Sequence, residues 1–129
     1  MYYKEFFLVF ILLALIDLPY LYLNTPMFRQ VVKQISGKGL TDRYYSAIMV
    51  YIALALGITF LVLPRIRAGN NRLADSILYG GIFGIASYAT FDFTIHFMLE
   101  GWSLQVAIMD TLWGAVLCSA VSFLVSYLL

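Results

Sequence analysis

Four long apolar runs divide the chain, at residues 6–23, 44–63, 74–99 and 104–128. A helix needs about 20 mostly apolar residues to cross a hydrocarbon core about 30 Å thick. Lipid offers the backbone no hydrogen-bond partner, and the runs show no strand pattern, so each is expected to be a helix. The pattern predicts an all-α integral membrane protein, with a bundle of four transmembrane helices in a single domain over residues 1–129.

The segment between the first two runs has a different pattern. Thr25 resembles an N-cap and Pro26 a first helical residue. The pattern predicts a short amphipathic helix on the membrane surface, and a helix that only covers the end of the bundle is the alternative. Its apolar face would hold Met27, Phe28, Val31, Val32 and Ile35, its polar face Arg29, Gln30, Lys33 and Gln34, and Gly37 and Gly39 would end it. Thr41 or Asp42 is expected to cap the second span, and Pro64 to close it.

Composition supports a membrane location. The chain is 63% hydrophobic and only 12% charged, with a mean hydropathy of +0.89. Soluble domains have about 25% charged residues, and one of this length could not hide so much apolar surface from water. The net charge of +1 gives no reason to expect nucleic acid as a partner, so the lipid bilayer is the expected surrounding. The one cysteine, Cys118, cannot form an intrachain disulfide.

Basic residues decide the orientation only weakly. With four spans, both termini and the basic turn between spans two and three share one side, which holds Lys4, Arg65, Arg67 and Arg72. The other side holds Arg29, Lys33, Lys38 and Arg43. Because the amphipathic helix partly accounts for the second set, the balance favours a multi-pass protein with cytoplasmic termini.

Three carboxylates lie inside the predicted spans, and they lie at one depth. Asp17 and Asp92 come shortly before the ends of spans one and three, and Asp110 comes shortly after the start of span four. At 1.5 Å per residue each is roughly 9–11 Å from the same membrane boundary. Tyr51 of span two falls at a similar depth. An ionisable residue inside a membrane is costly, so this set is a candidate site for ligand binding or proton relay.

Further polar and small residues accompany the acids. His96 and Tyr88 lie one turn on either side of Asp92, and Thr111 follows Asp110. Small residues predict close helix packing, at Gly80 and Gly84 in span three and at Gly114 in span four. Gly114 belongs to a repeat of short side chains, one at every fourth position. Its five members are Asp110, Gly114, Cys118, Ser122 and Ser126.

Three ionised carboxylates at one level would repel one another, so something must neutralise them. Protons, a cationic substrate or a divalent metal ion would all serve, and no lysine or arginine lies inside a span. A metal would use Asp92, His96 and Asp110, but this spacing is far weaker than a true metal signature, so no cofactor is predicted. The alternative is that the acids act only as hydrogen-bonding glue between helices.

Three functions follow from these alternatives. The favoured one is binding or transport of a small ligand, cation or proton at the carboxylate cluster; since four spans are few for a transporter, it implies a homodimer. The second is a structural or accessory membrane subunit. The third is a lipid-modifying enzyme with Asp92 or Asp110 as general acid or base. The sequence contains no nucleophile triad and no phosphate-binding loop, so it favours a non-enzymatic function.

Several segments, in order, resemble a family of small membrane proteins catalogued as domain of unknown function 2177. The segments are IDLPYL at 16–21, SYATFDFT at 87–94, GWS at 101–103 and MDTLWG at 109–114. The resemblance covers nearly the whole chain and implies four membrane spans, with Asp17, Asp92 and Asp110 at family positions. Phe91 stands where the family usually has tyrosine, and Pro19 and Tyr20 stand where it tends to have a tryptophan. His96 is not a family position. The resemblance implies no activity.

Overall fold

Four helical rods make up the described part of the chain. The computed structural model describes residues 2–36 and 44–129. The first rod is α1 (Tyr2–Ser36), and the last is α6 (Leu104–Leu128). The second rod consists of α2 (Tyr44–Gly57), the π-helical turn η1 (Ile58–Val62) and α3 (Leu63–Ala68). The third rod consists of α4 (Arg72–Asp75), the π-helical turn η2 (Ser76–Gly80) and α5 (Gly81–Met98). Every regular element in these residues is helical, which confirms the predicted all-α fold.

Three of the rods are long and apolar enough to cross a membrane. They are Tyr3–Gln34, Tyr45–Ala68 and Leu104–Leu128. The third rod is not among them, although the pattern predicted a span at 74–99. Its apolar run is diluted by glycines and by polar residues such as Asp92 and His96. The structure thus supports three of the four predicted membrane spans.

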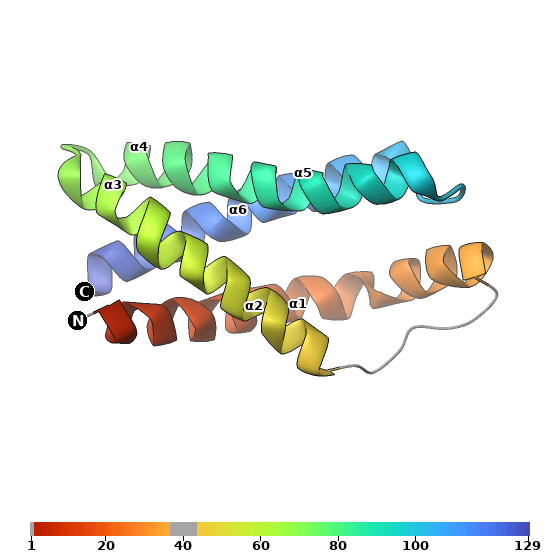
Figure 1. Cartoon of the computed structure of the whole chain (residues 1–129), viewed down its shortest axis with the longest axis horizontal. Helices are drawn as coiled ribbons and strands as arrows, with labels where there is room; N and C mark the ends of the chain where they lie inside the picture. The colour runs from red at the N-terminus through yellow and green to blue at the C-terminus, as the bar shows by residue number, and fades with distance from the viewer. Residues whose placement is uncertain (1, 37–43) are drawn as a thin grey trace.

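The two ends of the molecule differ in what they hold. Both termini and the turn between α3 and α4 lie at one end, here called the terminal end (Figure 1). The turn between α5 and α6 and the last turns of α1 lie at the other, called the distal end (Figure 1). At the terminal end Arg67 forms an ion pair of 2.7 Å with Glu5, which ties α3 to the start of α1.

The predicted separate helix after span one is wrong, because α1 runs without a break from Tyr2 to Ser36 through Pro19 and Pro26. Thr25 does not cap a helix there; its hydroxyl donates to the Leu21 carbonyl within α1. Four apolar residues of this last segment pack against Trp102 and its neighbours, namely Met27, Phe28, Val31 and Val32. Its polar residues Arg29, Gln30, Lys33 and Gln34 are exposed. This supports the alternative of a segment that covers the end of the bundle. The predicted stops and caps at Gly37, Gly39, Thr41 and Asp42 lie outside the described residues.

Proline does not end the second rod either. The predicted stop at Pro64 is wrong, because the helix continues to Ala68 with Pro64 in the first turn of α3. The π-helical turn η1 ends at Val62, two residues before this proline. A proline lacks the N–H that an uninterrupted α-helix would use, and a π-turn is one way to rearrange the backbone bonds around it.

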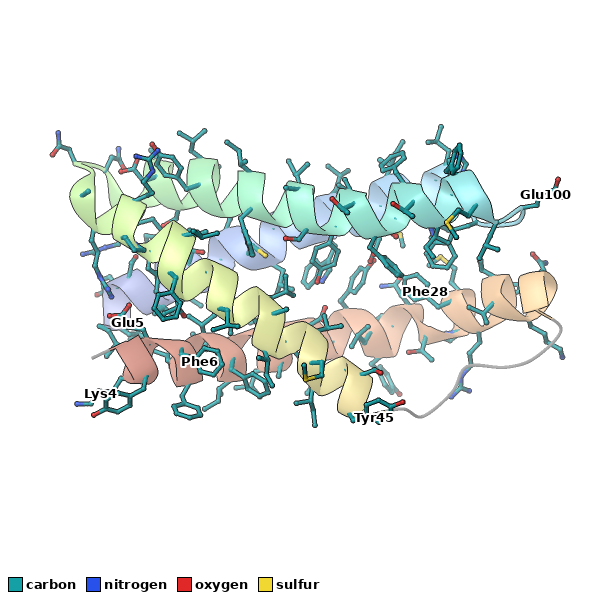
Figure 2. All side chains as sticks on the ribbon, in the orientation of Figure 1. Lys4, Glu5, Phe6, Phe28, Tyr45 and Glu100 are labelled. Carbon is teal, nitrogen blue, oxygen red and sulfur yellow. The ribbon has the colours of Figure 1, made fainter. Side chains whose placement is uncertain are left out.

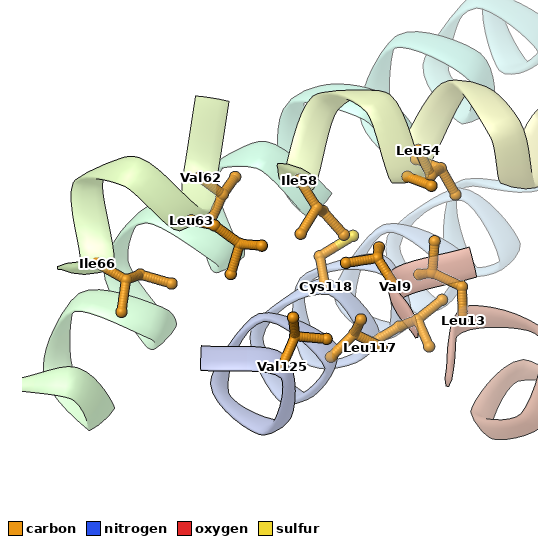
Figure 3. Close-up of a cluster of buried hydrophobic side chains, with 12 residues drawn as sticks. Val9, Leu13, Leu54, Ile58, Val62, Leu63, Ile66, Leu117, Cys118 and Val125 are labelled. Carbon is orange, nitrogen blue, oxygen red and sulfur yellow. The ribbon is translucent and has the colours of Figure 1, made fainter. Parts of the chain in front are cut away.

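The larger cluster of buried apolar side chains packs the rods against one another (Figure 3). It joins three rods, with Val9 and Leu13 from α1, Ile58 and Leu63 from the second rod, and Leu117 from α6, all fully buried. Cys118 is buried in the same cluster. This cluster holds the rods together, and a smaller apolar cluster around Trp102 packs the last turns of α1 against the α5–α6 turn.

Close backbone contact sets the distance between α5 and α6. A Cβ on Gly84 would lie 2.2 Å from the carbonyl oxygen of Gly114, and one on Gly80 would lie 3.0 Å from that of Cys118. A Cβ on Gly114 would in turn lie 2.3 Å from the Tyr88 ring. All five members of the repeat of short side chains on α6 are buried. Small residues therefore let the two helices approach at the level of the acids.

Candidate functional site

Asp17 joins three rods through hydrogen bonds. It lies on α1 with 6% of its surface exposed. The Tyr51 hydroxyl of α2 donates to Oδ2 at 2.6 Å, and the Trp113 indole N–H of α6 donates to Oδ1 at 2.8 Å. Each carboxylate oxygen thus has its own donor from a different rod. This geometry fits a carboxylate that stabilises the bundle and holds the two aromatic side chains in place.

Asp110 has one donor among the described residues. It lies on α6 with 8% of its surface exposed, and the Tyr20 hydroxyl donates to its Oδ1 at 2.9 Å. The Tyr20 ring stacks on the Trp113 ring, with centroids 4.6 Å apart and planes 5° from parallel. Because Trp113 donates to Asp17, this stacked pair connects the surroundings of Asp17 with those of Asp110.

Asp92 is the most buried of the three acids and the least satisfied. It has 0% of its surface exposed, and neither oxygen makes a hydrogen bond of acceptable geometry within the described chain. The Asp110 carboxyl and the Trp102 indole are polar side chains close to it. The Trp102 N–H is itself buried without an acceptor among the described residues. Asp92 is thus a fully buried carboxyl next to a second acid, which is costly in a membrane.

A cavity of about 510 Å³ opens beside these acids. All four rods contribute to its wall, and so does the turn before α6 (Figure 2 shows Phe28 reaching from α1 toward α5 and α6). Most of the wall is apolar or aromatic. Asp17 and Asp110 line the cavity, whereas Asp92 does not. The remaining lining residues are Tyr20, Leu21, Phe28, Val32, Val50, Leu54, Ser87, Tyr88, Phe91 and Trp102.

The other predicted site residues fall into two groups. Tyr51 and Tyr88 lie at the site, the first bound to Asp17 and the second in the cavity wall. Thr111 is buried beside Asp110, and its hydroxyl has no partner within the described chain. His96 lies apart from the acids: its Nδ1 is 2.5 Å from the Trp102 carbonyl oxygen. His96 thus links α5 to the turn before α6.

The structure does not bring a metal site together. Within residues 2–36 and 44–129, no three histidine, cysteine, aspartate or glutamate side chains are close enough to share a metal ion. Asp92 and Asp110 meet, but His96 binds the turn instead.

Sequence reasoning missed three residues of the site. Tyr20, Trp113 and Trp102 appeared only within the segments that carry the family resemblance, and the structure leaves Trp102 8% exposed. A usable signal was present, because Tyr20 and Trp113 each come three residues after an acid and so share its helix face. Trp102 stacks on Phe28, with centroids 6.2 Å apart.

The comparisons with curated proteins and with solved structures found no match. One family model does match, over residues 2–127, and its description is a predicted membrane protein, DUF2177. The match covers all three acids, the cavity wall and the helices that hold them. It confirms the resemblance seen in the sequence and agrees with the three apolar helices of the structure. This chain belongs to the DUF2177 family of membrane proteins.

Proposed function

We propose that the protein binds a small ligand in the cavity between its four rods, with buried carboxylates in the cavity wall. The cavity itself is the observation that carries this proposal. Its volume of about 510 Å³ falls within the range of small-molecule sites, which are mostly apolar with a few placed polar groups. This wall has that composition, since two carboxylates and two tyrosines interrupt an otherwise largely apolar and aromatic surface.

Hydrogen-bonding glue accounts for only part of the cluster. A carboxylate that serves as glue should have donors from neighbouring helices, and Asp17 has two. Asp92 has none within the described chain, and Asp110 has one. Such groups are costly to keep in a membrane, so their presence supports a role in binding.

We also propose that the third rod crosses the bilayer and that both termini face the cytoplasm. The third rod packs along α6 through the contact between Gly84 and Gly114. The turn that connects α5 to α6 is tight, with Gly101 in the left-handed region at φ 94°. Because α6 is expected to cross the bilayer, a helix packed along it should lie at the same depth in the membrane. Arg65 and Arg72 lie at the terminal end, each over a tyrosine ring, and arginines favour the cytoplasmic side.

A cysteine placed in the cavity tests whether small molecules enter it. Ser87 lines the cavity, and Ser87→Cys is nearly isosteric, while the native Cys118 is fully buried. We expect the new thiol of the purified protein to react with a small neutral thiol reagent and Cys118 to stay unmodified. Binding and transport then differ in access: a transporter admits a membrane-impermeant reagent from either side of a vesicle, and a binding protein from one side.

A matched pair of variants controls for entry by another route. Val50 lines the cavity and Ile48 does not, and both are exposed side chains on α2. Val50→Trp should slow the modification strongly because the larger side chain occupies the cavity, and Ile48→Trp should leave it unchanged. Equal rates in the two folded variants would show that the reagent does not pass through the cavity and would contradict the proposal.

A further inference from the structure

We propose that the ligand is an organic cation with a single positive charge and an apolar body, and that Asp110 is the carboxylate that holds it. This inference rests on the proposed binding function and narrows it to one chemical class. It is carried by three features of the site: the sign of the charges in the wall, the unequal satisfaction of the three acids, and the aromatic surface beside them.

The first feature is the sign of the charge. Within the described chain, Asp17 and Asp110 are the carboxylates that line the cavity, and no lysine, arginine or histidine lines it. A negatively charged ligand would therefore be repelled in a medium where charges are weakly screened. A neutral ligand would leave the charge of the wall unmatched. A cation supplies the missing charge.

The second feature distinguishes the three acids. Both oxygens of Asp17 already accept a hydrogen bond, from Tyr51 and Trp113. Asp92 is fully buried, has no donor within the described chain and lies against Asp110. Of the pair, only Asp110 lines the cavity, and its one donor, Tyr20, occupies Oδ1 alone. Among the carboxylates of the described residues that line the cavity, Asp110 is therefore the one not saturated with donors, which suits one positive charge on the ligand.

The third feature is the aromatic surface. Phe28, Phe91 and Trp102 all line the cavity, and they contact one another, with Trp102 stacked on Phe28 and edge-on to Phe91 at 6.2 Å between centroids. Aromatic faces attract organic ammonium groups, most strongly away from water. A hydrated metal ion would gain little from this wall, and the described residues offer it no set of three ligands. The wall favours a ligand whose bulk is hydrocarbon.

Equilibrium dialysis against a cation and its neutral isostere tests the inference. The probes are (4-phenylbutyl)trimethylammonium and the hydrocarbon in which a tert-butyl group replaces the ammonium group. The full chain is held in a non-ionic detergent, and protein-free micelles serve as the blank. We expect about one cation bound per chain, and binding of the hydrocarbon at least about tenfold weaker, because it lacks the charge.

Three variants assign the charge to one residue. Asp110→Asn keeps the size of the side chain and an acceptor for Tyr20, and it should weaken cation binding about tenfold or more. Asp75→Asn removes a carboxylate on α4, outside the cavity wall, and should change nothing. Val50→Trp should abolish binding of both probes because it fills the cavity. If Asp110→Asn fails to fold, the ratio of the two probes in the unmodified chain decides the question.

The failures are distinguishable. If the hydrocarbon binds as tightly as the cation and Val50→Trp abolishes both, the cavity binds ligands but the cationic class is wrong. Unchanged cation binding in folded Asp110→Asn would overturn the assignment to this residue. If neither probe binds, or if Val50→Trp leaves binding intact, the cation inference and the proposed cavity function fall together.

Discussion

At the scale of single residues, the three acids do different things because their partners differ. Asp17 is saturated with donors, Asp110 has one, and Asp92 has none within the described chain. A buried group with all its hydrogen bonds stabilises the fold, whereas one without them is costly. The stability of each Asp→Asn variant should therefore reveal the role of each acid, since Asn keeps the size and removes the charge.

Asp92→Asn should raise the melting temperature. The amide replaces the second carboxyl next to Asp110 with a neutral group that can donate to it, so we expect a gain on the order of 1–2 kcal/mol. The melting temperature of the purified protein in detergent measures this. A clear decrease would mean that the Asp92 carboxyl stabilises the bundle and is glue after all.

Asp17→Asn should have the opposite effect. An asparagine side chain has one carbonyl oxygen for the two donors Tyr51 and Trp113, so one of them loses its acceptor. We expect a loss of about 1–3 kcal/mol, the usual result of leaving a buried donor unsatisfied. The same melting experiment measures it, with Asp75→Asn as the control for charge removal, and an unchanged melting temperature would contradict this role.

The sequence located the acids but not the residues that distinguish them. Depth along each helix comes directly from counting residues, so Asp17, Asp92, Asp110 and Tyr51 could be placed at one level in advance. Rotation of each helix about its axis does not come from counting. It decides that Trp113 reaches Asp17 rather than lipid and that His96 binds the Trp102 carbonyl rather than the acids.

At the scale of elements, α5 and α6 are held by backbone contact at Gly84. A Cβ there would lie 2.2 Å from the Gly114 carbonyl oxygen, so even Gly84→Ala must push the helices apart. Gly81→Ala is the matched control, because its Cβ would meet only the Ser119 Oγ, at 3.3 Å, and a hydroxyl can turn away. We expect Gly84→Ala to lower the unfolding free energy by about 1–3 kcal/mol or more and Gly81→Ala to be near neutral, measured by melting in detergent. Equal effects would contradict the close packing.

The boundaries of the helices were harder to predict than their existence. The apolar runs gave each rod correctly, because hydropathy acts over a whole segment. Prolines misled at Pro26 and Pro64, where the helices continue. A proline removes one backbone hydrogen bond, and the surrounding packing decides whether the helix tolerates that loss. The Trp102 cluster holds the last turns of α1 in place.

At the scale of the whole molecule, the topology predicts which segments share a side of the membrane. The termini and the α3–α4 turn lie at the terminal end, and the α5–α6 turn lies at the distal end (Figure 1). Single cysteines at Tyr3, Asn70 and Glu100 replace exposed residues. With an impermeant thiol reagent on intact cells, Tyr3→Cys and Asn70→Cys should behave alike, protected inside the cell, and Glu100→Cys should be labelled from outside. Labelling of all three from one side would show that the third rod does not span.

If the carboxylates of the cavity attract positive charge, a thiol placed inside it should react selectively with cations, and this selectivity can be measured directly. The rates at which Ser87→Cys reacts with a cationic and an anionic thiol reagent of similar size are compared, each divided by its rate with a free thiol. The cationic reagent should be faster by about tenfold or more, and Asp110→Asn should narrow the difference. Equal corrected rates, or a faster anionic reagent, would contradict the account.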